Sequence, residues 1–231
     1  MFRRHAIGLV LSSLMLLPLP AAASDREAAA TALIDSMISD LETFLATDTG
    51  DEDARAAEID RVLSTYFDMD SITRFSAGQY WRAASGDQKS EYGELFREVL
   101  CGTIVRNFDQ LYGLVYSAGG TTAKGDKFVI VQGTFTDTTG ARAPVAVNWR
   151  VLTRDGKPPK VFDIEIENLS LLITQKQENV AVIRKNKGDF LALINTMRER
   201  LEKPVHEGGC QHSAARGTAC RSAKAADGPS G

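Results

Sequence analysis

Three carboxylates alternate with apolar residues along one short segment. Of all the residue patterns in the chain, this one comes nearest to the paired carboxylates of an acid–base catalyst. The three are Asp163, Glu165 and Glu167, and on an extended strand neighbouring members would share one face at about 6.5 to 7 Å. Glycosidases hold two carboxylates at such separations, but on opposite sides of a sugar ring and usually from different strands. We therefore interpret the three carboxylates as the solvated outer face of a strand. A second pair, Asp68 and Asp70, is predicted to cap a short helix.

Histidine is missing from the body of the chain. The three histidines are His5 near the N-terminus and His206 and His212 near the C-terminus. This distribution excludes catalytic triads that use histidine as the base, and most catalytic zinc sites. The sequence also has no nucleophile elbow, phosphate-binding loop or dinucleotide-binding fingerprint. We predict that the protein is not an enzyme and that it holds no metal and no cofactor.

The N-terminus has the pattern of a cleavable secretory signal. Arg3 and Arg4 precede an apolar run over residues 6–19, and the small residues 21–23 follow it. The run is too short to remain as a membrane-spanning helix. Residues 1–23 are therefore predicted to be a signal peptide, and the mature chain is expected to be soluble and exported.

The charge of the chain is mildly acidic. It has 27 basic and 30 acidic residues, a formal net charge of −3, which becomes about −5 without the two arginines of the predicted signal. A nucleic-acid partner usually requires a basic face, so none is expected. Residues 204–231 are rich in glycine, alanine and serine and are predicted to be disordered. Whether Cys210 and Cys220 in this tail form a disulfide is left open.

Between these ends, residues 24–203 are enough for one domain or two small ones, and hydrophobic periodicity predicts an α+β arrangement of helices and strands in them. Apolar residues recur every three or four positions in the predicted helices, and every second position in the predicted strands. The helices are expected near residues 25–46, 51–66, 68–75, 87–111, 169–183 and 189–201, and the strands near 114–118, 127–136, 144–152 and 160–167. Ser85 and Gln88 have the spacing of a capping box and are predicted to begin the helix near residues 87–111. Turn residues between the last three strands predict an antiparallel meander.

The segment 160–184 connects the predicted sheet to a helix. Phe162, Ile164 and Ile166 are expected on one strand face, opposite the three carboxylates. After Asn168 the apolar residues change to helical spacing, beginning at Leu169. The apolar face of the strand and the apolar stripe of the helix must then share a core, or a cavity within it.

Three blocks of the sequence resemble the MlaC-type, toluene-tolerance family of periplasmic phospholipid-binding proteins. They are Gly78-Gln79-Tyr80-Trp81-Arg82 with the following residues to Arg97, Pro144-Val145-Ala146-Val147-Asn148-Trp149-Arg150, and residues 163–183. The resemblance covers about residues 25–201. Asn168 replaces the usual glycine of the family, and asparagine tolerates the left-handed conformation that a bend there requires.

The resemblance implies a fold, a role and a location. The fold would be a four-stranded curved antiparallel sheet packed against a layer of about six to seven helices, enclosing an apolar lipid pocket. The protein would carry phospholipid through the periplasm, with its acyl chains buried, and so maintain outer-membrane lipid asymmetry. Its partners would be an outer-membrane lipoprotein complex and an inner-membrane ABC transporter complex with its MCE-type subunit.

Periodicity and the shape of the family together predict which residues line the pocket. The predicted lipid-binding residues are Phe96, Leu100, Ile104, Phe108, Val147, Trp149, Phe162, Ile164 and Leu172. Lipid head-group selectivity, the number of acyl chains, the transport direction and the docking surfaces are left open.

Three alternatives also remain. The ligand could be a hopanoid or another lipid carried by the same family, or the protein could be an interaction module without a small ligand. An enzyme built around such a pocket would need an inward acid beside a tyrosine such as Tyr80 or Tyr116. The predicted strand faces place no acid inward, which argues against an enzyme.

Overall fold

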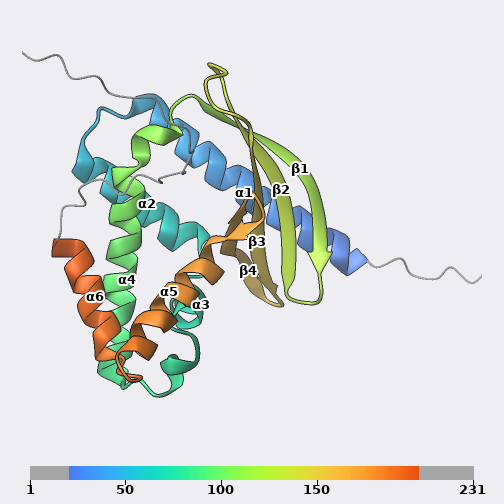
Figure 1. Cartoon of the computed structure of the whole chain (residues 1–231). Coiled ribbons are helices and arrows are strands. Elements are labelled where there is room, and N and C mark those ends of the chain that lie inside the picture. Colours follow the sequence, from blue (N-terminus) through green and yellow to red (C-terminus); the bar gives the residue numbers. More distant parts are fainter. Residues whose placement is uncertain (1–20, 203–231) are drawn as a thin grey trace, which may run out of the picture.

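A computed structural model of the chain describes residues 21–202, and residues 21–24 by their backbone alone. Most of the predicted signal peptide and the whole predicted tail, with Cys210 and Cys220, lie outside the described residues. The helices within them are α1 (Ala21–Thr47), α2 (Glu52–Tyr66), α3 (Met69–Ser76), α4 (Gly86–Arg106), α5 (Leu171–Lys185) and α6 (Leu191–Glu202), with short 3-10 helices η1 (Gly78–Arg82) and η2 (Phe108–Leu111). The predicted α+β class is confirmed (Figure 1).

The strands form one open antiparallel sheet in the order β1-β2-β3-β4-β5. Its members are β1 (Leu114–Lys124), β2 (Phe128–Asp137), β3 (Val145–Arg154), β4 (Lys157–Ile166) and β5 (Leu169–Ser170). The predicted meander is confirmed, but the sheet has five strands, because the chain pairs again with β4 before α5 begins. Strand β1 is also longer than predicted, since a register shift between Ala118 and Thr121 lets it pass Gly119 and Gly120 and continue.

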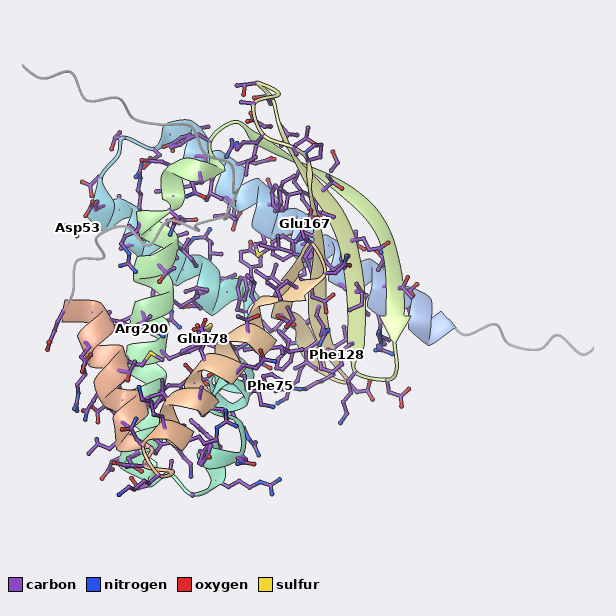
Figure 2. All side chains as sticks on the ribbon, in the orientation of Figure 1. Asp53, Phe75, Phe128, Glu167, Glu178 and Arg200 are labelled. Atoms are coloured by element: carbon purple, nitrogen blue, oxygen red, sulfur yellow. The ribbon has the colours of Figure 1, made fainter. Side chains whose placement is uncertain are left out.

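A bulge in β4 changes the predicted faces of that strand. Val151 pairs with Val161 whereas Arg150 pairs with Asp163, so Phe162 is the extra residue. Val161 joins the core under the sheet. The ring of Phe162 instead lies 5.5 Å from the rings of both Phe75 and Phe128, the two residues labelled near the lower edge of the sheet in Figure 2. The predicted common face of Phe162, Ile164 and Ile166 is therefore wrong for Phe162.

The bend after β4 uses two left-handed residues. Glu167 and Asn168 have φ of 50° and 65°, and asparagine adopts this conformation more readily than most residues. Ser170 then caps α5 by accepting a hydrogen bond from the backbone N–H of Ile173 at 3.0 Å. Helix α5 thus begins at Leu171, two residues later than predicted. Earlier in the chain, the predicted cap at Asp68 and the capping box of Ser85 and Gln88 are confirmed.

Two larger cores and one small cluster around Ile59, Leu63 and Phe108 hold the elements together. In the first, α1 runs across the inner face of the curved sheet (Figure 1). This core is formed by Ala30, Ile34, Met37 and Ile38 of α1, Val62 and Tyr66 of α2, and Val129, Val131, Val147, Trp149, Val151 and Val161 of the sheet. The second core joins α3, α4, α5 and α6 around Tyr92 of α4. We call these the sheet core and the helical core.

Candidate functional site

An apolar cavity of about 240 Å³ lies between the helices α1 and α2 and the inner face of the sheet. Its walls come from α1 (Met37, Ile38, Leu41, Glu42, Leu45), α2 and the residue after it (Ile59, Val62, Leu63, Phe67), α4 and η2 (Ile104, Leu111), and the sheet (Leu114, Tyr116, Phe135, Val145, Val147, Trp149, Ile164, Ile166). Glu42 is the only charged residue among them.

The local sequence explains why these side chains meet. Met37, Leu41 and Leu45 are four residues apart on α1 and therefore form one stripe along the helix. On β3, Val147 and Trp149 are two residues apart and so point to the same face. Pairing of Trp149 with Ile164 extends that face onto β4. The helix stripe and the strand face thus oppose each other across the cavity.

Of the nine predicted pocket residues, four line this cavity: Ile104, Val147, Trp149 and Ile164. The other five are placed elsewhere, with Phe96, Phe162 and Leu172 at the helical core, and Leu100 and Phe108 in a small cluster with Ile59 and Leu63. Helix α4 packs mainly against α2, α3 and α6, so only its C-terminal end reaches the cavity.

Sequence reasoning missed the contribution of α1, α2, β1 and β2 to the cavity wall. The signal was present, because Met37 and Leu41 stand in a clear helical stripe. A stripe that faces a cavity has the same pattern as one that faces a packed core, so periodicity alone could not separate α1 from α4. Tyr116 and Phe135 line the cavity from β1 and β2.

Two polar atoms lie at the sheet side of the cavity. The indole N–H of Trp149 is buried without a hydrogen-bond partner among the described residues, and the side chain is only 6% exposed. The hydroxyl of Tyr116 donates to the carbonyl oxygen of Gln132 at 3.4 Å. Burial raises the pKa of Tyr116, and the nearby indole N–H opposes this rise. The ring of Tyr116 lies over Gly133, where an added Cβ would come within 2.3 Å of it, so this position requires glycine.

The mouth of the cavity is partly apolar. Ile166 lines the cavity and is 37% exposed, and Leu169, just beyond the bend after β4, is 58% exposed. Glu42 also belongs to the cavity lining, is exposed, and makes no ion pair within residues 21–202. The opening therefore combines apolar side chains with one carboxylate and has no cation.

A cluster of charges fixes the loop between α1 and α2 to the segment that closes the cavity beside Leu111. Arg55 donates to Asp48 Oδ2 from Nε at 2.9 Å and from Nη2 at 2.7 Å. The hydroxyl of Tyr112, next to Leu111, donates to the same oxygen. The hydrogen bonds from Arg55 and Tyr112 lower the pKa of Asp48 to about 2. This cluster therefore stays ionised and holds the rim of the cavity in place at neutral pH.

The three alternating carboxylates do not form a catalytic site. Glu165 is paired with Arg150, and Glu167 is exposed. Asp163 was expected on a solvated face, but it is only 4% exposed, because β5 and α5 fold over that side of β4. Its carboxylate accepts hydrogen bonds from Ser170 Oγ at 2.6 Å and from the backbone N–H of Leu172 at 3.1 Å. Its role is to fix the start of α5 against the sheet.

Two further searches cover residues 21–202 only. Within that range there is no group of three or more histidine, cysteine or acidic residues that could hold a metal ion. Over the same residues, no helix combines the length and the apolar character needed to cross a membrane.

Comparisons with known proteins agree with this architecture. Residues 31–199 match the family described as MlaC protein. Among solved structures, the chain is similar to the phospholipid-binding protein from Ralstonia solanacearum in complex with a phospholipid, with 24% identity and a TM-score of 0.60 over 76% of this chain and 96% of that chain. No curated protein matches the sequence. MlaC proteins are not enzymes, in agreement with the prediction made for this chain. Because the family match spans most of the sequence, the chain belongs to the MlaC family.

Proposed function

We propose that this protein is a periplasmic phospholipid carrier that buries acyl chains in the cavity between α1, α2 and the sheet. The observation that carries the proposal is the lining, in which Glu42 at the mouth is the only charged side chain. A similar structure is that of a phospholipid-binding protein in complex with a phospholipid. Membership of the MlaC family agrees with such a ligand.

The energetics of an acyl chain explain the need for a carrier. Each buried CH₂ group contributes about 0.8 kcal/mol, so a chain of about 16 carbons loses on the order of 12 kcal/mol on entering water. A cavity of this composition replaces the contacts of a bilayer with similar apolar contacts. Exchange with a membrane complex can then proceed with little net change in free energy, and no chemical step is required of the protein.

The size of the cavity implies that its walls move when lipid enters. Its volume of about 240 Å³ is below the range of about 300 to 1,000 Å³ that is usual for ligand pockets. A phospholipid with two chains therefore requires α1 or α2 to shift away from the sheet. Apart from Glu42, the side chains of these helices that face the cavity are apolar, so the shift would separate mainly apolar contacts there. Arg26, Glu27 and Thr31 hold the N-terminal part of α1 to the sheet by hydrogen bonds.

The proposed route connects the two membranes of the envelope. The protein would exchange phospholipid with an outer-membrane lipoprotein complex and with an inner-membrane ABC transporter complex through its MCE-type subunit, and so maintain lipid asymmetry. Family membership and the signal-like sequence of residues 1–23 support this location and these partners. The direction of transport would be set by the partners, because the sequence contains no nucleotide-binding motif.

Lipid content tests the proposal directly. The mature protein is purified from the cell envelope without detergent, and its organic extract is analysed by mass spectrometry. We expect near-stoichiometric phospholipid in the natural protein. A hopanoid in its place would assign the protein to a different lipid. A chain that is free of lipid, and takes none from phospholipid vesicles, would contradict the carrier function.

A pair of variants tests the cavity itself. Val147→Glu places a charge in the apolar lining, where an unpaired carboxylate is strongly unfavourable. Gln132→Glu adds the same charge at an exposed position of the neighbouring strand. We expect Val147→Glu to lose bound lipid and Gln132→Glu to keep it, with circular dichroism confirming that both fold. Equal lipid content in the two folded variants would show that lipid binds elsewhere.

A further inference from the structure

A second groove, of about 470 Å³, lies outside the cavity and shares no lining residue with it. It is lined by Ser71, Arg74 and Phe75 of α3, Gly78, Gln79, Trp81 and Arg82 of η1, Phe162 of β4 and Lys176 of α5. We call it the η1 groove. Much of the Gly-Gln-Tyr-Trp-Arg sequence block therefore contributes to this groove and none of it to the cavity.

The η1 groove has a positive rim without local neutralisation. Arg74 and Arg82 are exposed, and within residues 21–202 neither they nor Lys176 form an ion pair or a hydrogen bond to an acid. No acidic residue lines the groove. The whole chain has a net charge of −3, so this concentration of cations does not follow from a basic surface in general. An anionic group would be attracted to it.

The floor of the η1 groove is aromatic. Phe75, Trp81 and Phe162 are half-buried in it, and the Nζ of Lys176 lies 4.5 Å from the ring centre of Phe75. On a neighbouring helix, the Nζ of Lys89 lies 5.8 Å from the ring centre of Trp81. Half-exposed rings next to unpaired cations suit a ligand that has both carboxylates and apolar side chains.

The shape of the η1 groove is maintained by a glycine. Gly78 has φ of +59°, and an added Cβ would come within 2.8 Å of Val180 on α5. Glycine therefore allows η1 to lie directly against α5, with Trp81 and Arg82 on one side of the groove and Lys176 on the other. A groove between two elements fits an extended segment better than it fits a flat surface.

From these features we infer that the η1 groove is a docking site for an acidic, leucine- or aromatic-containing segment of a protein partner. Carboxylates of the segment pair with Arg74, Arg82 and Lys176, and its apolar side chains cover Phe75 and Trp81. The site is independent of lipid binding in the cavity. In Figure 2, Phe75 marks its position, apart from Glu167 at the bend near the cavity mouth.

The distribution of tryptophan provides a specific assay. The chain has two tryptophans, Trp81 in the η1 groove and Trp149 in the cavity. In a Trp149→Phe variant, intrinsic fluorescence reports only on the groove. The probe is a short synthetic peptide that alternates glutamate and leucine, and the control peptide has glutamine in place of glutamate. We expect the glutamate peptide, but not the glutamine peptide, to change the Trp81 emission in a saturable way. The affinity for the glutamate peptide should fall as salt is raised, because salt screens the charges.

Charge variants identify the site of binding. Arg74→Gln with Arg82→Gln in the same background is expected to weaken the affinity for the glutamate peptide by at least about 10-fold. The matched control, Arg106→Gln with Lys124→Gln, removes two exposed cations that line neither the groove nor the cavity, and is expected to change it by less than about 2-fold. Calorimetric titration of the natural chain provides a second measurement that does not depend on the Trp149→Phe variant.

The inference is overturned by any of three results. The glutamate peptide could fail to bind, the Arg74→Gln/Arg82→Gln variant could bind it as the control does, or phosphatidylglycerol vesicles without peptide could produce the same Trp81 response. The last result would assign the groove to an anionic membrane surface. Lipid content is measured in parallel with the same charge substitutions made in the natural chain, without Trp149→Phe. It keeps this test separate from the carrier proposal, because Arg74 and Arg82 lie outside the cavity.

Discussion

The two cores of the molecule bury apolar side chains in different ways. In the sheet core, α1 and the inner face of the sheet stand apart far enough to leave a cavity. In the helical core, α3, α4, α5 and α6 close around Tyr92, whose side chain is 0% exposed. Both sets of elements have similar apolar stripes, so the difference does not come from hydrophobicity.

Buried polar groups account for much of the contrast. In the helical core the hydroxyl of Tyr92 lies 2.6 Å from Ser76 Oγ and accepts a hydrogen bond from Asn179 Nδ2 at 2.9 Å. A network of this kind keeps its hydrogen bonds only if the helices stay at fixed positions. The cavity contains no such network, and the indole N–H of Trp149 is unpaired there. The helical core is therefore a rigid support, and the sheet core can adapt its volume.

The largest contrast is expected from matched leucine truncations. Leu193→Ala removes a fully buried side chain from the helical core and should reduce the free energy of unfolding by about 2 to 5 kcal/mol. Leu41→Ala acts on a half-buried wall of the cavity, where fewer atomic contacts are lost, and should cost about 1 kcal/mol. Chemical denaturation of both variants measures the difference. Equal losses would mean that the cavity is packed as tightly as the helical core.

A smaller contrast is expected from removing one hydroxyl in each core. Tyr92→Phe leaves Asn179 and Ser76 without a shared buried partner, and should cost about 1 to 3 kcal/mol. Tyr116→Phe removes a single long hydrogen bond to Gln132 and should cost less than about 0.5 kcal/mol. Both variants are measured by denaturation at neutral pH. A larger loss for Tyr116→Phe would assign the rigid network to the cavity instead.

The sequence predicted the elements well, because each signal was local. The capping box at Ser85, the cap at Asp68 and the alternation along β3 all depend on neighbouring residues. The failures depend on distant contacts. The bulge that turns Phe162 toward Phe75 arises from pairing between β3 and β4, which no local pattern reveals.

The candidate site was predicted only in part for the same reason. Val147, Trp149 and Ile164 follow strand alternation and line the cavity, whereas Phe96 and Leu172 belong to the helical core. Which helix stripe faces a cavity depends on the crossing of α1 over the sheet, a tertiary feature. Burial of Asp163 was missed because it requires β5 and α5 to fold back over β4.

Acid should distinguish the rim of the cavity from the helical core, with the smallest effect of the three comparisons. Arg55 and Tyr112 hold the pKa of Asp48 at about 2, whereas an unfolded aspartate titrates near about 3.9. Between these values the unfolded chain binds a proton that the folded chain does not, so the free energy of unfolding decreases as the pH falls from about 4 through 2. The hydroxyl and amide network around Tyr92 and Asn179 has no carboxylate and adds no such dependence.

The Asp48→Asn variant isolates that contribution. We expect it to be less stable than the natural chain at neutral pH, because the ion pair with Arg55 is lost, and to lose less of its remaining stability on acidification. Asp126→Asn, at an exposed position in the turn after β1, is the control. Its free energy of unfolding should decrease with falling pH as it does in the natural chain. Hydrogen exchange between pH 4 and 2 would then show earlier opening of the α1–α2 loop and η2 than of α4 in the natural protein. If α4 opened first, the rim cluster could not be the acid-sensitive part, and the assignment of rigidity to the helical core would have to be reversed.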